Sequence, residues 1–85
     1  MFKLIRKRDN FTFEGDTYKN VRYKMDGNNI TEFPPEIGCG IIVFNQLSGI
    51  VIDYWQTTII KSVEKINDNK YIIQTKNSEY SVEKI

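Results

Sequence analysis

The chain has 85 residues, a formal net charge of +1, one cysteine and no histidine. This length allows one small domain with a thin hydrophobic core and little room for an enclosed active site. A charge so close to zero gives no overall field that would attract nucleic acid or an acidic membrane. One cysteine cannot form an internal disulfide, so the sequence predicts a single soluble domain over residues 1–85 that folds by packing alone in a reducing cytoplasm.

The amino-acid usage favours strands over helices. The chain contains thirteen isoleucines but only two leucines and no alanine. Leucine and alanine are strong helix formers, whereas β-branched and aromatic residues prefer strands. An A/T-rich genome would also enrich isoleucine, lysine and asparagine, so codon usage accounts for part of this bias and the fold for the rest.

The first half of the chain divides into short strands with turns between them. Residues 2–7 and 11–13 are predicted strands, and residues 14–16 are a turn before a strand over residues 18–25. The segment Asp26-Gly27-Asn28-Asn29 predicts a hairpin, because glycine and asparagine tolerate the positive φ of such turns. Residues 30–33 return as a short strand that ends at Pro34-Pro35.

The second half continues the same pattern. Residues 41–44 are continuously apolar, as expected of a strand buried on both faces. Leu47-Ser48-Gly49 turns the chain into residues 50–52 and 54–55. Residues 57–66 fit a helix or a strand, and their β-branched residues favour the strand. Residues 71–75 and 78–85, joined by a turn at Lys76-Asn77, complete an antiparallel meander.

These elements predict an all-β, mainly antiparallel fold with little or no helix. Turns every 8–12 residues are typical of small barrels, and closure protects edge strands. We therefore expect a small SH3-like barrel or a strongly bent sheet of about six strands. The most apolar region, residues 38–55, is interrupted by polar side chains and cannot span a bilayer, so no membrane partner is expected.

Two motifs in the second half resemble a known group of proteins. Trp55-Gln56-Thr57-Thr58 precedes a hairpin that carries Thr75-Lys76-Asn77-Ser78-Glu79-Tyr80. This resembles short proteins from phages and mobile elements of low-G/C Gram-positive bacteria, in which Trp-x-Thr-Ser precedes Thr-x-Asn-Ser-x-Tyr. The resemblance covers about residues 50–82 and departs at Thr58, where the pattern has serine. It implies an SH3-like barrel and a phage or mobile-element setting, but no activity, because a fold does not fix a function.

The residue set argues against catalysis. Without histidine the chain lacks the side chain best suited to proton transfer near neutral pH and cannot form a Ser-His-Asp or Cys-His arrangement. Cys39 lies between two glycines with no activating neighbour in sequence, and is expected to be buried or half-buried. Glu32, Glu36 and Asp53 are expected to be solvated loop charges. We predict no catalytic residue, metal or cofactor, and hence no enzyme.

Two sets of residues are candidates for binding. Tyr54 and Trp55 are the candidate anchors for a protein partner if exposed, since aromatic residues dominate interface energetics; the alternative is that Trp55 is a core residue. Arg6, Lys7 and Arg8 would steer that partner. The candidate nucleic-acid surface, in which basic residues alternate with an aromatic one, consists of Lys3, Arg6, Lys7, Arg8, Arg22, Tyr23 and Lys24.

From these features we expect a non-enzymatic accessory protein of a phage or mobile element that binds and sterically occludes a host protein. The resemblance makes a component of an antiviral defence system a candidate target. The alternatives are a small nucleic-acid-binding barrel that uses the basic N-terminal strand and a self-associating virion component. The sequence does not fix the oligomeric state.

Overall fold

The computed structural model describes residues 1–22 and 30–85. These residues form strands joined by turns and short connections, with no helix among them. The strands are β1 (Phe2–Arg6), β2 (Phe11–Gly15), β3 (Thr17–Arg22), β4 (Ile30–Thr31), β5 (Cys39–Leu47), β6 (Ile50–Gln56), β7 (Ile60–Asn67), β8 (Lys70–Thr75) and β9 (Glu79–Lys84). The all-β prediction is confirmed.

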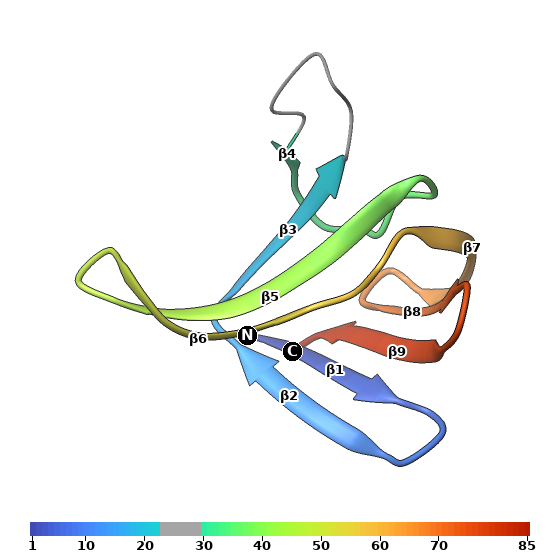
Figure 1. Ribbon diagram of the computed structural model, residues 1–85, viewed down its shortest axis with the longest axis horizontal. Helices are drawn as coiled ribbons and strands as arrows, with labels where there is room; N and C mark the ends of the chain where they lie inside the picture. The colour runs from blue at the N-terminus through green and yellow to red at the C-terminus, as the bar shows by residue number, and fades with distance from the viewer. Residues whose placement is uncertain (23–29) are drawn as a thin grey trace.

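The strands form two antiparallel sheets. One has the order β2-β1-β9-β8-β7 and the other the order β4-β3-β5-β6. The chain passes between the sheets at two corners, at Asp16 between β2 and β3 and at residues 57–59 between β6 and β7 (Figure 1). The result is the strongly bent antiparallel sheet that was one of the two predicted architectures. The termini lie together, since the amide of Ile85 donates to the carbonyl oxygen of Met1 at 2.8 Å.

The strand count differs from the prediction. The described residues contain nine strands rather than about six. The predicted segments 11–13 and 30–33 are both strands: β2 extends the first to Gly15, and β4 keeps only Ile30 and Thr31 of the second. The predicted turn over residues 14–16 is correspondingly narrower, with Glu14 and Gly15 still in β2.

Other local predictions agree with the fold. The ambiguous segment 57–66 is largely strand β7, which begins at Ile60. Two hydrogen bonds between Thr75 and Ser78 close the turn after β8. The amide of Ser78 donates to Oγ1 of Thr75 at 3.2 Å, and the amide of Thr75 donates to the carbonyl oxygen of Ser78 at 2.8 Å. The predicted hairpin turn at residues 26–29 lies outside the described residues; the strands beside it, β3 and β4, pair antiparallel.

The core lies between the two sheets. Its buried apolar residues come from both, and they are Leu4, Tyr18, Ile41, Val43, Ile60, Tyr71, Ile73, Tyr80 and Val82. Strand β5 was expected to be buried on both faces, and the structure shows one face more buried than the other. Ile41 and Val43 are fully buried, while Ile42 and Phe44 are half-buried. Cys39 is fully buried, as predicted.

A candidate protein-binding hairpin

Strands β5 and β6 form a hairpin that projects beyond the rest of the fold (Figure 1). Its tip is the two-residue turn Ser48-Gly49 between the paired residues Leu47 and Ile50. Both turn residues have positive φ, 53° at Ser48 and 80° at Gly49. Two consecutive left-handed residues are the conformation that matches the twist of the flanking strands, so the turn favours a hairpin here.

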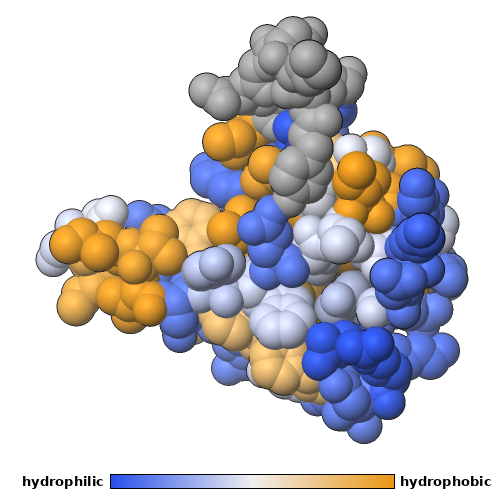
Figure 2. Space-filling model, viewed as in Figure 1, coloured by the Kyte–Doolittle hydropathy of each residue, from blue (hydrophilic) through white to orange (hydrophobic). Residues whose placement is uncertain are grey.

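The projecting end of this hairpin carries exposed apolar side chains. These residues are 49% to 68% exposed, and they are Leu47, Ile50, Val51, Ile52 and Tyr54. Figure 2 shows an orange, hydrophobic region on the projecting part of the molecule, where the four aliphatic residues of this group lie. We call this group the apolar tip. Single exposed apolar residues are common on protein surfaces, but a contiguous group on one element is typical of an interaction site.

A network of polar groups fixes the base of the hairpin. The amide of Asp16 donates to Oδ1 of Asn45 at 3.0 Å, and Nδ2 of Asn45 donates to Oδ1 of Asp53 at 2.8 Å and to the carbonyl oxygen of Glu14 at 2.9 Å. The amide of Gln46 donates to Oδ2 of Asp16 at 3.3 Å. Asn45 therefore joins both strands of the hairpin to the β2–β3 corner, and the apolar tip extends from a fixed base.

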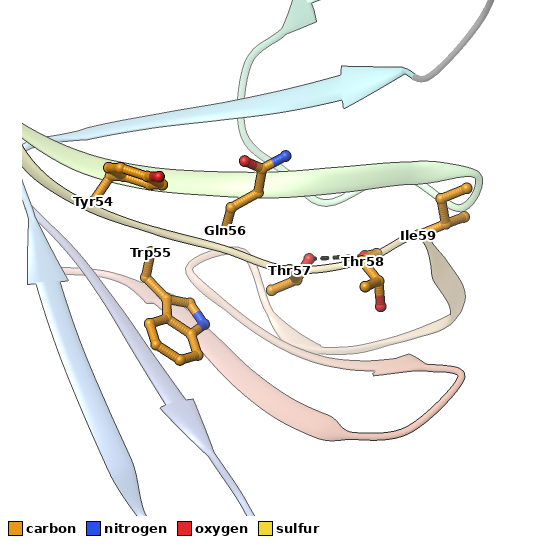
Figure 3. Close-up of a pocket in the computed structure, with 6 residues that line it drawn as sticks. All are labelled: Tyr54, Trp55, Gln56, Thr57, Thr58 and Ile59. Carbon is orange, nitrogen blue, oxygen red and sulfur yellow. Dashed lines mark hydrogen bonds between the residues drawn. The ribbon is translucent and has the colours of Figure 1, made fainter.

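The structure separates the two predicted aromatic anchors. Tyr54 is exposed, whereas Trp55 is half-buried and packs against the core (Figure 3). The Trp55 ring lies 4.4 Å from the Phe11 ring, centroid to centroid, and Cζ of Arg6 lies 5.1 Å from the Trp55 ring and 5.2 Å from the Phe11 ring. Cation–π contact and aromatic packing thus hold Trp55 inside the fold. Of the two residues, Tyr54 is the more exposed to solvent.

A shallow groove continues from the apolar tip along the chain. Its lining residues are Tyr54, Trp55, Gln56, Thr57, Thr58 and Ile59, and its volume is about 700 Å³ (Figure 3). Thr57 fixes this segment against β5: its amide donates to the carbonyl oxygen of Ile41 at 2.8 Å, and the amide of Ile41 donates to its Oγ1 at 3.1 Å. The groove and the apolar tip form one mostly apolar surface along β6. Asp53 is the only charged residue in this part of the sequence.

The predicted basic residues are distributed among acidic ones. Arg6 pairs with Asp9 at 2.7 Å and Lys7 with Glu79 at 3.1 Å. Arg8 is exposed beside Asp9. Lys3 is half-buried in β1, where its register partners are Glu14 on β2 and Glu83 on β9. The cluster at the start of the sequence is therefore not a uniform basic surface in space.

In the second half of the predicted nucleic-acid surface, Arg22 is the one residue that the structure describes, and it is also paired with a carboxylate. Arg22 donates to Glu36 at 2.7 Å, and Tyr23 and Lys24 lie outside the described residues. Glu36, expected to be a solvated charge, also accepts from Oγ1 of Thr31 at 3.1 Å. The hydrogen bond from Arg22 lowers the pKa of Glu36, and the same bond raises the pKa of Arg22. This pair ties the connection before β5 to β3, and Arg22 is not a free cation.

Replacing Arg6 by alanine is expected to shift the fluorescence emission of Trp55 to longer wavelength. The substitution removes the guanidinium that covers the indole, and water takes its place. Trp55 is the single tryptophan of the chain, so the emission reports on this site alone. Lys7→Ala is the matched control, since it removes an adjacent basic side chain that is largely exposed. Identical emission from the Arg6 variant and the parent protein would contradict the packing described here.

The Arg6–Asp9 pair also predicts a dependence of stability on pH. The hydrogen bond from Arg6 lowers the pKa of Asp9 from 3.8 to about 2, and the amide of Phe11 contributes in the same direction. Because the folded pKa is the lower one, the stabilisation is complete above about pH 4 and is lost as the pH falls through about 2. The difference in unfolding free energy between the parent protein and Asp9→Asn should therefore shrink from about pH 6 to about pH 2. Urea titrations at each pH measure it, and a difference that stays constant over this range would contradict the assignment.

No protein-family model matches the chain, and no curated protein or solved structure matches it either. The resemblance to phage and mobile-element proteins therefore stays a prediction from the motifs in residues 50–82. Among the described residues, no group of three or more histidine, cysteine or acidic side chains is arranged to hold a metal ion. No helix long and apolar enough to cross a membrane occurs in that part of the chain.

Sequence reasoning identified Tyr54 but missed the rest of the apolar tip. Residues 50–52 and Leu47 were predicted only as a strand and a turn. A local signal was present, since residues 47–52 contain four apolar side chains on both sides of a tight turn and no charge. Two strands that meet in a short turn and carry apolar residues on both faces cannot bury all of them unless another layer covers the turn.

Proposed function

We propose that the chain is a non-enzymatic accessory protein of a phage or mobile element that binds a host protein in the host cytoplasm and sterically occludes one of its functional surfaces. The observation that carries the proposal is the apolar tip on the projecting β5–β6 hairpin. Fully burying an aliphatic side chain of this size contributes about 1.5–3 kcal/mol. A partner that covers the tip would therefore gain substantial binding energy from few residues.

The setting and the target class rest on the resemblance of residues 50–82 to phage and mobile-element proteins. On that basis the host protein would be a component of an antiviral defence system. The absence of histidine from the sequence supports a steric rather than a catalytic mode of action. The nucleic-acid alternative has less support, because Arg6, Lys7 and Arg22 are paired with carboxylates.

The experiment compares the parent protein with a double variant, Ile50→Thr with Ile52→Thr, in affinity capture from a nuclease-treated host lysate. Both side chains are exposed and threonine keeps the strand preference, so the unfolding free energy should change by less than about 0.5 kcal/mol. Ile66→Thr on β7 is the matched control, since Ile66 is also an exposed strand isoleucine but lies on the other sheet. We expect one host protein that the parent and the control retain and the double variant loses.

Two outcomes would contradict the proposal. Retention that disappears when the lysate is treated with nuclease would favour the nucleic-acid alternative. Concentration-dependent oligomers in light scattering, lost in the double variant, would instead favour a self-associating virion component that uses the same apolar tip.

A further inference from the structure

We propose that the apolar tip docks on an apolar surface of the partner protein that is bordered by lysine or arginine side chains. This inference rests on the proposed function and specifies the chemistry of the partner. It follows from the charges at the base of the hairpin, from the bulge in β6 and from the contrast with β7, an edge strand of the five-stranded sheet.

Among the described residues, the charged groups next to the apolar tip are carboxylates that form no ion pair. Asp16 and Asp53 are exposed and lie on either side of Asn45, which contacts both. None of the ion pairs among the described residues includes either carboxylate. A partner that covers the tip would partly desolvate them, and a carboxylate taken out of water without a compensating cation is costly. Complementary basic groups at the rim of the partner surface remove that cost and steer the encounter.

The hydrogen bonds at the base make these carboxylates a fixed feature of the surface. Asp16 accepts from the amide of Gln46 and from Oγ1 of Thr17, the latter at 2.7 Å, while Asp53 accepts from Asn45. Neither side chain can turn far from the hairpin without breaking these bonds. Their negative charge therefore stays at the border of the apolar tip when a partner approaches.

The shape of β6 favours contact through side chains over addition of a strand. In the described part of the chain β6 pairs only with β5, so its other edge is open. The register of the β5–β6 pair shifts along the hairpin. Asn45 lies opposite Asp53 and Gln46 lies opposite Val51, which leaves Ile52 as an extra residue in β6. Such a bulge interrupts the regular spacing of backbone groups along the edge and hinders strand addition. The partner must then cover the exposed side chains with an apolar surface of its own.

One edge strand of the five-stranded sheet, β7, has a protection that β6 lacks. Strand β7 carries exposed charged side chains at Lys61, Glu64 and Lys65. Charged residues, especially lysine, block pairing at sheet edges. The residues from Ile50 to Ile60 contain no lysine, arginine or proline, and Asp53 is the only charge. The apolar tip thus lacks the protection that β7 has, as expected of a surface that a partner covers.

The same charges disfavour two other occupants. An anionic membrane would repel the carboxylates at the base, since none of the ion pairs among the described residues includes Asp16 or Asp53. Two copies that meet tip to tip would bring like carboxylates together, which is unfavourable at an interface. A protein surface with a basic border satisfies both the apolar and the charged groups.

The test uses two synthetic helical peptides with the same leucine stripe, one bordered by lysines and the other by glutamates, titrated into isotopically labelled protein. We expect the lysine peptide to shift the amide signals of the apolar tip and to bind roughly tenfold or more tightly than the glutamate peptide. Asp16→Asn with Asp53→Asn should remove this preference. Asp68→Asn, in the exposed β7–β8 turn, is the matched control and should keep it.

The outcomes separate this inference from the proposed function. Equal affinity for both peptides, lost for both in the Ile50→Thr, Ile52→Thr variant, would overturn the charge preference and leave the apolar tip as the binding surface. Signal shifts outside the hairpin, or binding of neither peptide, would also overturn the inference. So would co-sedimentation with vesicles of phosphatidylcholine and phosphatidylglycerol, because that result would identify a lipid surface as the occupant.

Discussion

Replacing Asn20 by alanine is expected to destabilise the protein by roughly 2–4 kcal/mol. Asn20 is fully buried in β3, and its side chain is fully bonded. Its Oδ1 accepts from the hydroxyl of Tyr18 at 2.5 Å, and its Nδ2 donates to the carbonyl oxygens of Glu32 at 2.9 Å and Pro34 at 2.8 Å. The substitution leaves three polar groups without their partner and also creates a cavity, which explains the size of the effect.

Asn20 is one of the residues that hold the segment after β4 on the sheet, beside the Arg22–Glu36 pair and the packing of Phe33 against the core. The two carbonyl groups that it binds belong to residues 32 and 34, which have no strand partner of their own among the described residues. Loss of the asparagine should therefore loosen this segment before it affects β8 and β9. Hydrogen exchange of the amides near Glu32 and Glu36 measures that local effect.

Urea unfolding of Asn20→Ala, with Asn69→Ala as control, tests the prediction. Asn69 is exposed in the turn between β7 and β8, so its replacement should change the unfolding free energy by no more than about 0.5 kcal/mol. Tyr18→Phe removes one of the three bonds and should give an intermediate loss of about 1 kcal/mol. A loss for Asn20→Ala no larger than that of the control would mean that water replaces the amide, and would contradict this account.

Replacing Gly15 by alanine should cost about 2–3 kcal/mol, because β2 passes very close to β5 at this residue. A β-carbon at Gly15 would lie 2.7 Å from Cγ1 of Val43 and 2.8 Å from the carbonyl oxygen of Phe44. Val43 is fully buried in the core, and Phe44 belongs to a strand that pairs on both sides. Neither can move aside without disturbing the sheet, so the added methyl group must strain the corner between the two sheets.

Gly38→Ala provides a comparison of a different physical kind. A β-carbon there would meet open space, but Gly38 has φ of 88°, which disfavours an alanine by roughly 1–2 kcal/mol. Thermal and urea unfolding should therefore rank Gly15→Ala as the more destabilising. In the double variant Gly15→Ala with Val43→Ala, the clash with Cγ1 of Val43 is removed. The double variant should therefore lose less unfolding free energy than the two single variants lose in sum. Full additivity, or no loss at Gly15, would show that the corner can relax.

The local sequence determined the strands and several of their turns. The β-branched residues of segment 57–66 predicted a strand, and the structure has β7 there. Thr75 and Ser78 close their turn through the hydrogen bonds that such residues form with nearby backbone. These features depend on residues within a few positions of each other, which is why one sequence suffices to predict them. The all-β class follows from the same preferences summed along the chain.

The roles of the individual aromatic and basic residues depended on contacts across the fold. Arg6 and Trp55 are 49 positions apart, and only the meeting of β1, β2 and β6 places the guanidinium over the indole. Lys7 meets Glu79 and Arg22 meets Glu36 for the same reason. A cluster of basic residues in the sequence therefore says little about the charge of a surface, because neighbouring strands supply carboxylates from elsewhere in the chain.

The exposure of the apolar tip was decided by tertiary structure. Residues 41–44 and residues 50–52 are both short, apolar runs rich in β-branched residues, and their composition does not distinguish a buried strand from an exposed one. The first run crosses the second sheet, which covers Ile41 and Val43. The second lies on the part of the hairpin that extends past that sheet, and so Ile50 and Ile52 remain in contact with water (Figure 1). Burial of an apolar strand requires an opposing layer, and where that layer ends is a property of the whole fold.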